Sequence, residues 1–403
     1  MRQRMKTPGF DRRGFLHLIV GAGISALLPS WALAYERAGP VAPRMARFPQ
    51  KAELILLTDR PPQLETPLHY FRQDLTPNEA YFVRWHLGGY PTRVDLGEFR
   101  LKIDGHVATP FELTLTDLTR QFEPVELIGF NQCSGNARSL FDPKPPGGQW
   151  GNGAMGNARW TGVRLKDLLA KAGVRGGAVE VALSGLDESP MPALPKFVKS
   201  LTFDHANDGE VMVAYAMNGA PLPMLNGFPL RLIVPGWYAT YWVKSLARVE
   251  VLSSPLHNLW MDKAYRLPNN DTLSEEEDHL ATDTVPINRF SIHSIFVRPE
   301  PLETVQLGRA YPLEGLAMDS GYGLTGVEVS ADDGRSWNAA QLDPDLGRYS
   351  WRRWRMSWTP TQRGPYALKV RATNKAGEQQ FVKQWNHGGY ARRVIETTTG
   401  MVT

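Results

Sequence analysis

Cysteine is nearly absent from this sequence, because its 403 residues include a single one, Cys133. One cysteine cannot form an internal disulfide. It also cannot supply the paired thiols of a C-x-x-C-H haem site or of a cysteine-rich zinc site. We therefore expect no haem of this type in the chain.

An excess of charge is also absent once the first residues are set aside. Residues 1–34 hold 5 of the 45 Lys and Arg and 1 of the 41 Asp and Glu, so the rest of the chain is balanced. Such a chain has no global positive field to attract nucleic acid, and we expect no nucleic-acid partner. No P-loop motif G-x-x-x-x-G-K-[ST] occurs, and no Rossmann fingerprint is evident in its strand–helix context.

The sequence also lacks an apolar run long enough to span a bilayer with ease. Its most apolar run lies near the N-terminus. Phe15–Leu28 follows a basic start and precedes Ala32-Leu33-Ala34, a pattern typical of a secretory signal peptide. Arg12-Arg13, followed by Phe15-Leu16, resembles the twin-arginine export signal. We predict cleavage near Tyr35 and export of a folded, cofactor-loaded protein to the periplasm. We expect no stable membrane span in the mature form.

The stretch from Asn131 to Trp160 contains Cys133 among many Gly, Asn and Arg residues. It lacks sustained apolar periodicity, which predicts a long ordered loop, and such loops are usually functional. A soft thiolate among cations suits a soft metal or an anionic cofactor. The alternative is that Cys133 is a small buried hydrophobe, as lone cysteines often are.

The elements around this loop are predicted from periodicity and caps. Val125–Asn131 is expected to be a strand that leads into the loop, and Leu115–Gln121 and Val163–Ala172 are expected to be helices. Residues 81–87 alternate as a strand with Phe82, Arg84 and His86 on one face, which is either a polar pocket or a solvent face. Residues 35–75 are Pro-rich and are expected to cross a domain surface without regular structure.

The sequence predicts two domains after the signal peptide. Residues 35–268 mix strands and helices in an α+β domain, and the acidic, polar residues 269–286 are expected to be a linker. Residues 287–403 contain short alternating runs without helices, which favours an all-β, immunoglobulin-like sandwich. Asp333-Gly334, between two of these runs, predicts a hairpin.

Six segments together resemble the sulfite oxidase family of molybdenum enzymes: FVRWH, NQCSGNAR, PGGQWGNGAMGNARWTGV, YAMNGAPLP, NGFPLRLIVPG and WNHGGYARR. The likeness runs from about residue 55 to the C-terminus. It is strongest to the catalytic subunits of bacterial periplasmic sulfite dehydrogenases. The resemblance implies a molybdopterin-binding α+β domain followed by an immunoglobulin-like domain.

The resemblance also implies roles for individual residues. Cys133 would ligate molybdenum, and Asn226 stands where vertebrate relatives have a cofactor-binding histidine. Arg392 is treated only as a candidate pocket residue. The implied active-site residues are Arg84, His86, Arg138, Trp150 and Tyr265, and the implied cofactor-binding residues are Cys133, Asn136, Asn226, Arg231 and Lys244.

The activity implied is oxidation of sulfite to sulfate at a molybdenum–molybdopterin cofactor. Electrons would pass to an external c-type cytochrome, because the chain has no haem site of its own. The sequence leaves open whether the C-terminal domain forms a homodimer or docks the cytochrome. Alternative functions are a sulfane dehydrogenase, a sulfoxide reductase with a quinone partner, and a non-catalytic periplasmic binding module.

Overall fold

The computed structural model describes residues 43–403, and residues 44–403 form one compact unit. The predicted signal peptide, residues 1–34, lies outside the described residues and stays a prediction. Within residues 43–403, no helix has both the length and the apolar character needed to cross a bilayer.

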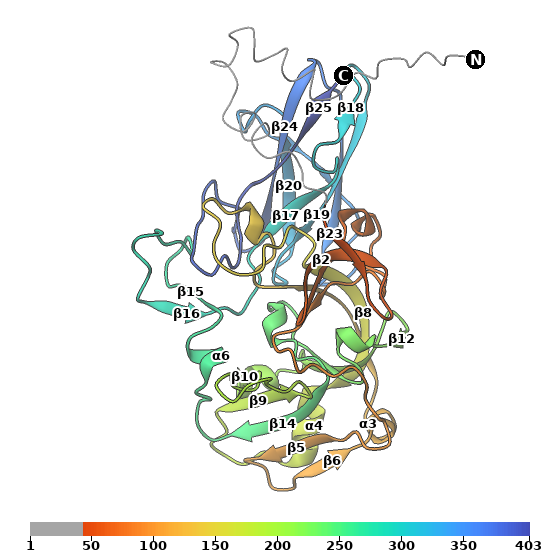
Figure 1. The fold of residues 1–403 in the computed structure, drawn as a ribbon, viewed down its shortest axis with the longest axis vertical. Coiled ribbons are helices and arrows are strands. Elements are labelled where there is room, and N and C mark those ends of the chain that lie inside the picture. The colour runs from red at the N-terminus through yellow and green to blue at the C-terminus, as the bar shows by residue number, and fades with distance from the viewer. Residues whose placement is uncertain (1–42) are drawn as a thin grey trace, which may run out of the picture. The chain divides into compact units, whose positions relative to one another are not determined.

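The first part of the described chain forms an antiparallel sheet of β1 (Met45–Arg47), β2 (Glu53–Asp59), β3 (Pro62–Glu65) and β4 (Val83–Arg84) (Figure 1). The expectation that residues 35–75 lack regular structure was therefore wrong for β1, β2 and β3, whereas β4 lies within the predicted strand 81–87. Leu54, Leu56 and Leu64 point into a buried cluster, and their alternation was masked by the high proline content around them. This sheet fixes Arg84, which lies opposite Gln63 of β3.

Two further sheets follow. One has the order β10-β9-β14-β5-β6, and the other has the order β12-β11-β8-β7 with β13 paired to β11. A large hydrophobic cluster, with Ile103, Val163 and Leu232 among its buried members, packs the two sheets into the core. The strands are β5 (Leu101–Gly105), β6 (Phe111–Leu113), β7 (Val125–Gln132), β8 (Met155–Arg164), β9 (Glu180–Gly185), β10 (Val198–Thr202), β11 (Met212–Met217), β12 (Ala220–Pro221), β13 (Arg231–Ile233) and β14 (Leu246–Leu252).

The structure has helices at both expected places, and the second begins at Leu165 and not at Val163. α3 (Leu115–Gln121) begins after Thr114, whose hydroxyl accepts from the Asp117 N–H while Asp117 accepts from the Thr114 N–H. α4 (Leu165–Ala172) ends at Gly173, which is left-handed with φ 66°. Both predicted helices are confirmed. The other helices of residues 43–403 are α5 (Phe203–Ala206), α6 (Leu259–Asp262) and the 3₁₀ turns η1 (Leu68–Arg72), η2 (Arg138–Leu140), η3 (Met224–Asn226) and η4 (Ala239–Tyr241).

β7 and β8 form a hairpin whose connection is the cysteine loop. Their ladder ends at the pair Gln132 and Met155, and the Cys133 N–H then donates to the Ala154 carbonyl. The loop between them is thus anchored at its base by a regular ladder. The predicted strand leading into the loop is confirmed, whereas residues 155–160, which were expected to belong to the loop, form the first part of β8.

The C-terminal part is rich in strands and has two sheets, ordered β17-β19-β23-β22 and β18-β25-β24-β20-β21 (Figure 1). They pack on each other through a buried cluster that includes Leu313, Val327 and Trp354. Asp333 and Gly334 have φ of 64° and 87°, as the predicted hairpin requires. The strands are β17 (His293–Arg298), β18 (Thr304–Val305), β19 (Tyr311–Met318), β20 (Leu324–Ser330), β21 (Asn338–Ala339), β22 (Gln341–Leu342), β23 (Arg352–Trp358), β24 (Gly364–Asn374) and β25 (Glu396–Val402).

Between these parts, β15 (Arg266–Pro268) pairs with β16 (Thr284–Pro286). The predicted linker, residues 269–286, is mostly the connection of this small hairpin. The domain boundaries and the immunoglobulin-like classification of the C-terminal sheets stay predictions.

Candidate active site

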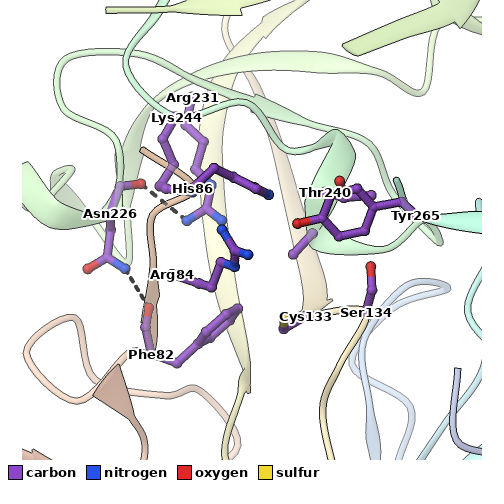
Figure 2. Close-up of a pocket in the computed structure, with 11 residues that line it drawn as sticks. Phe82, Arg84, His86, Cys133, Ser134, Asn226, Arg231, Thr240, Lys244 and Tyr265 are labelled. Carbon is purple, nitrogen blue, oxygen red and sulfur yellow. Dashed lines mark hydrogen bonds between the residues drawn. The ribbon is translucent and has the colours of Figure 1, made fainter. Parts of the chain in front are cut away.

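Segments far apart in the sequence meet around one cavity, hereafter the inner cavity (Figure 2). Phe82, Arg84 and His86 all line it, whereas Val83 and Trp85 are buried in the cluster behind them. The predicted alternation is therefore confirmed, and its polar face looks into a pocket. The other expected site residues that line the inner cavity are Cys133, Asn226, Arg231, Lys244 and Tyr265.

Cys133 lies at the end of β7 and is 8% exposed. Its carbonyl accepts from the Asn136 N–H, and the Asn136 side-chain oxygen accepts from the Ala154 N–H. Asn136 does not line the inner cavity but shapes the turn that presents Cys133 to it. Although the cysteine is buried, it opens onto a polar cavity, so it is not simply a core hydrophobe.

His86 is packed among aromatic rings. It stacks on Phe197 at 3.7 Å between ring centroids and meets Trp260 and Tyr265 edge-on. Burial, with the nearby charges of Arg84, Lys244 and Lys199, holds the pKa of His86 well below its usual range. His86 is therefore a neutral side chain at neutral pH.

Two cations, the buried Arg231 and the partly buried Lys244, face the same cavity. Arg231 is 3% exposed and lies over the rings of Trp160 and Trp242, and one of its terminal nitrogens donates to the Asn226 carbonyl. Burial lowers the pKa of Arg231 to about 10.

Lys244 lies over the Trp85 ring. Burial and the charges of Arg231 and Arg84 lower the pKa of Lys244 to about 7, although Asp187 opposes this. Among residues 43–403, no carboxylate lies within ion-pair distance of Arg231, Lys244 or Arg84. Burying cations without counter-charges is costly, so this arrangement fits an anionic ligand.

Tyr265 follows α6 and adopts a left-handed conformation with φ 58°. This is uncommon for a residue with a large side chain and often marks a functional site. Its ring stacks on Tyr390 at 5.5 Å. Burial raises the pKa of Tyr265, so its hydroxyl keeps its proton and can donate.

A second cavity, hereafter the vestibule, adjoins the first and shares Arg84, Cys133 and Tyr265 with it. Arg138 and Trp150, the other two expected active-site residues, line the vestibule instead. The cavity measures about 440 Å³. The predicted residues are thus divided between an inner part and an outer part.

Arg138 is held by backbone carbonyls from two segments. Its Nε and one Nη donate to the Gly388 carbonyl at 3.1 and 2.8 Å, and the other Nη donates to the Gly148 carbonyl at 3.0 Å. It also lies over the Tyr390 ring. Arg138 therefore joins the cysteine loop to the chain between β24 and β25, in addition to lining the vestibule.

The sequence did not assign several residues that line these cavities. Arg392, the candidate drawn from the C-terminal motif, lines neither cavity, because its guanidinium donates to Glu396. Other residues of the same motif line the vestibule instead. The motif therefore indicated a segment of the site, but Arg392 was the wrong residue within it. The unassigned lining residues are Gln63, Gly135, Pro146, Gly147, Gly148, His387, Gly388 and Tyr390 of the vestibule and Ser134, Ala239 and Thr240 of the inner cavity.

Two protein families match the chain. Residues 87–260 match the oxidoreductase molybdopterin binding domain, and residues 284–390 match the Mo-co oxidoreductase dimerisation domain. The mitochondrial sulfite oxidase of Macaca fascicularis is 33% identical over 349 residues, which cover 83% of this chain and 62% of that protein. The sulfite oxidase of Gallus gallus is 31% identical over 331 residues, covering 78% and 70%. This chain belongs to the sulfite oxidase family of molybdenum enzymes.

Other proteins that are similar to this chain are named for different activities. Nitrate reductase [NADH] 2 of Arabidopsis thaliana is 30% identical over 72% of this chain and 34% of that protein. The crystal structure of the sulfane dehydrogenase SoxCD from Paracoccus pantotrophus shares the fold, with a TM-score of 0.74 and 22% identity over 99% of this chain and all of the other. The predicted family and the predicted molybdopterin-binding fold with a β-rich C-terminal domain are confirmed.

The residues of the inner cavity fit the family's molybdopterin. Three buried polar atoms that line it have no partner in the described structure: Ser134 Oγ, Thr240 Oγ1 and Arg231 Nε. Such orphaned atoms indicate a polar ligand. At one side of the cavity Asn226, Arg231 and Lys244 offer donors and positive charge, and at the other Cys133 offers a sulfur ligand (Figure 2). Cations suit the phosphate of a pterin cofactor, and a thiolate suits molybdenum.

Proposed function

We propose that this enzyme oxidises sulfite to sulfate and passes the electrons singly to a c-type cytochrome. Sulfite and one water give sulfate, two protons and two electrons. When bound, the molybdenum cofactor supplies the oxygen-transfer and redox chemistry. The protein supplies substrate binding, orientation and a favourable electrostatic field.

The observation that carries this proposal is the lining of the vestibule. It contains two arginines, Arg84 and Arg138, and no aspartate or glutamate among its described lining residues. Arginine recognises small oxyanions through charge-assisted, planar donors. A vestibule of this charge favours a dianion such as sulfite over a neutral sulfoxide, which was one of the alternatives.

Arg84 is the better placed of the two cations to act on substrate. It faces both cavities. Among residues 43–403 a single one of its side-chain donors, an Nη, is engaged, with the Trp85 carbonyl at 2.9 Å. The protonated Tyr265 hydroxyl can donate to a substrate oxygen at the same place. Trp150 and Tyr390 wall the vestibule and limit the water around the reacting group, which strengthens these electrostatic interactions.

The compartment and the electron acceptor belong to the same proposal. Support for a periplasmic enzyme comes from the twin-arginine pattern of residues 1–34, and a c-type cytochrome is the natural one-electron acceptor there. The match of residues 284–390 to a dimerisation domain supports a homodimer. Light scattering on the purified protein, alone and with cytochrome c, would test both associations.

The deciding experiment is sulfite-dependent reduction of cytochrome c, with molybdenum quantified in the same sample. We expect turnover with about one molybdenum per chain. If the protein contained molybdenum but did not turn over sulfite, the proposed substrate would be wrong, and the proposed cofactor would still stand. In that case thiosulfate and protein-bound sulfane sulfur are the next substrates to assay, because the vestibule has room for a longer sulfur compound. Sulfite turnover without molybdenum would contradict the proposal as a whole.

A further inference from the structure

Lys51 is a buried cation that lies outside both cavities. It precedes β2 and is 5% exposed. Its Nζ donates to the Asn78 carbonyl at 2.7 Å and to Asn226 Oδ1 at 2.6 Å. Within residues 43–403 no carboxylate lies within ion-pair distance of it, and Glu79, whose charge acts on it from further away, is exposed to solvent.

Keeping this ammonium group buried is costly for the protein alone. Burial holds the pKa of Lys51 well below its usual range, and the positive charge of Arg231 lowers it further. Two neutral oxygens compensate a buried ammonium only in part. A methionine of similar length would fill the same space without this cost.

Asn226 connects Lys51 to the inner cavity. Its side-chain oxygen accepts from Lys51, its amide nitrogen donates to the Phe82 carbonyl at 3.0 Å, and its main-chain carbonyl accepts from Arg231. Figure 2 shows Asn226 on the same side of the cavity as Arg231 and Lys244, opposite Cys133. Lys51 therefore lies directly behind the cationic end of the cavity.

We propose that Lys51 is a positioning residue for the anionic end of the cofactor: its charge, acting through Asn226, completes a buried cationic receptor with Arg231 and Lys244 for a phosphate group. In the cofactor-free protein the three cations oppose one another. When the phosphate binds, each of them gains a counter-charge in a medium of low dielectric constant. This inference depends on cofactor binding and not on which sulfur compound is oxidised.

The test compares Lys51→Met with the wild type in two preparations of the full chain, one loaded and one produced without molybdopterin synthesis. The first readout is molybdenum and pterin per chain after extended dilution. We expect on the order of tenfold lower retention in Lys51→Met, because the interaction lost is with a charged group. The second readout is the melting temperature of the cofactor-free protein, which we expect to equal or exceed that of the wild type.

These two readouts separate the proposal from a structural role. Wild-type retention in Lys51→Met would overturn it, and so would a lower melting temperature of the cofactor-free variant, which would show that Lys51 stabilises the fold itself. Lys51→Gln keeps a donor to Asn226 without the charge. We expect it to fold and to lose cofactor similarly, and wild-type retention in this variant would also overturn the proposal. Lys166→Met, an exposed lysine on α4, is the matched control and should retain the cofactor.

Discussion

Arg84 is the cation that the inner cavity and the vestibule share, and most of its donors are free to bind a ligand. Replacing it with glutamine removes the charge and keeps much of the side-chain volume. We expect Arg84→Gln to raise the KM for sulfite by roughly tenfold to a hundredfold, because a charge-assisted contact to the substrate is lost.

Steady-state kinetics with cytochrome c as acceptor would measure this effect. Molybdenum content should remain close to that of the wild type, which would show that the cofactor is still bound. Arg335→Gln, on the exposed surface of the C-terminal part, is the control and should leave KM unchanged. A wild-type KM in Arg84→Gln would place the sulfite site elsewhere.

Lys199, on β10, is a second buried lysine that the sequence did not single out. It is 1% exposed, donates to the Trp260 carbonyl and lies over the ring of Tyr241. Burial and the charge of Arg266 lower the pKa of Lys199 to about 7, although Glu180 opposes this. The ordinary pKa of a lysine side chain is 10.5.

The sign of the stability effect follows from this pKa. Between about pH 7 and 10.5 the unfolded chain binds a proton at Lys199 that the folded chain does not, so the wild type gains stability as pH rises through this window. We expect Lys199→Met, cofactor-free, to be more stable than the wild type by about 1–3 kcal/mol at pH 6. The difference should shrink towards pH 10. Urea denaturation at several pH values would measure it, and a difference independent of pH would contradict the argument.

At the scale of elements, the sequence predicted those helices, strands and turns whose formation depends on residues close together in the chain. The helix α3, the strand β7 and the Asp333-Gly334 hairpin are local features, and they were confirmed. Strands β1–β3 were missed, because the prolines around them masked the alternation of Leu54, Leu56 and Leu64. The pairing of β3 with β4 spans the whole of η1 and could not be read from neighbouring residues.

The vestibule was predicted only in part for a similar reason. Part of its wall is formed by His387, Gly388 and Tyr390, and hydrogen bonds from Arg138 hold the Gly388 carbonyl, 250 residues away in the sequence. Hydrophobic periodicity carries no information about such a contact. The motif that contains these residues could be recognised, but not the direction in which each of them points.

A substitution at Gly389 would test whether the contact between this wall and Arg138 matters for activity. Gly389 has φ 55°, and a Cβ there would lie 2.7 Å from Cγ of Arg138. We expect Gly389→Ala to displace Arg138 and lower kcat/KM for sulfite on the order of tenfold, with a loss of roughly 1–2 kcal/mol in the free energy of unfolding from the left-handed conformation.

Gly377, in the same connection between β24 and β25, is the matched control. It also has a positive φ, 78°, but a Cβ there meets no atom within 4 Å. Gly377→Ala should therefore lose similar stability and keep wild-type kinetics. Equal loss of kcat/KM in the two alanine variants would mean that backbone strain, and not the contact with Arg138, explains the effect.

At the scale of the molecule, the strand that leads to the cysteine loop is in direct contact with the C-terminal sheets. The Phe130 N–H, on the strand that leads to Cys133, donates to the Tyr349 carbonyl. Trp351 packs against Phe71 and Phe130 in a buried cluster and donates to the Asp74 carbonyl. The predicted catalytic and C-terminal domains thus share a hydrophobic core.

Trp351→Ala tests this coupling. Removing a fully buried tryptophan should lower the free energy of unfolding by about 3–5 kcal/mol. Because the cluster is shared, we expect calorimetry to show one transition at a lower temperature in the variant, as in the wild type. Trp337→Ala, at a partly exposed position outside this cluster, should cost less. If Trp351→Ala instead produced two transitions, the C-terminal sheets would fold independently, and the position of Cys133 would depend on the β7–β8 ladder alone.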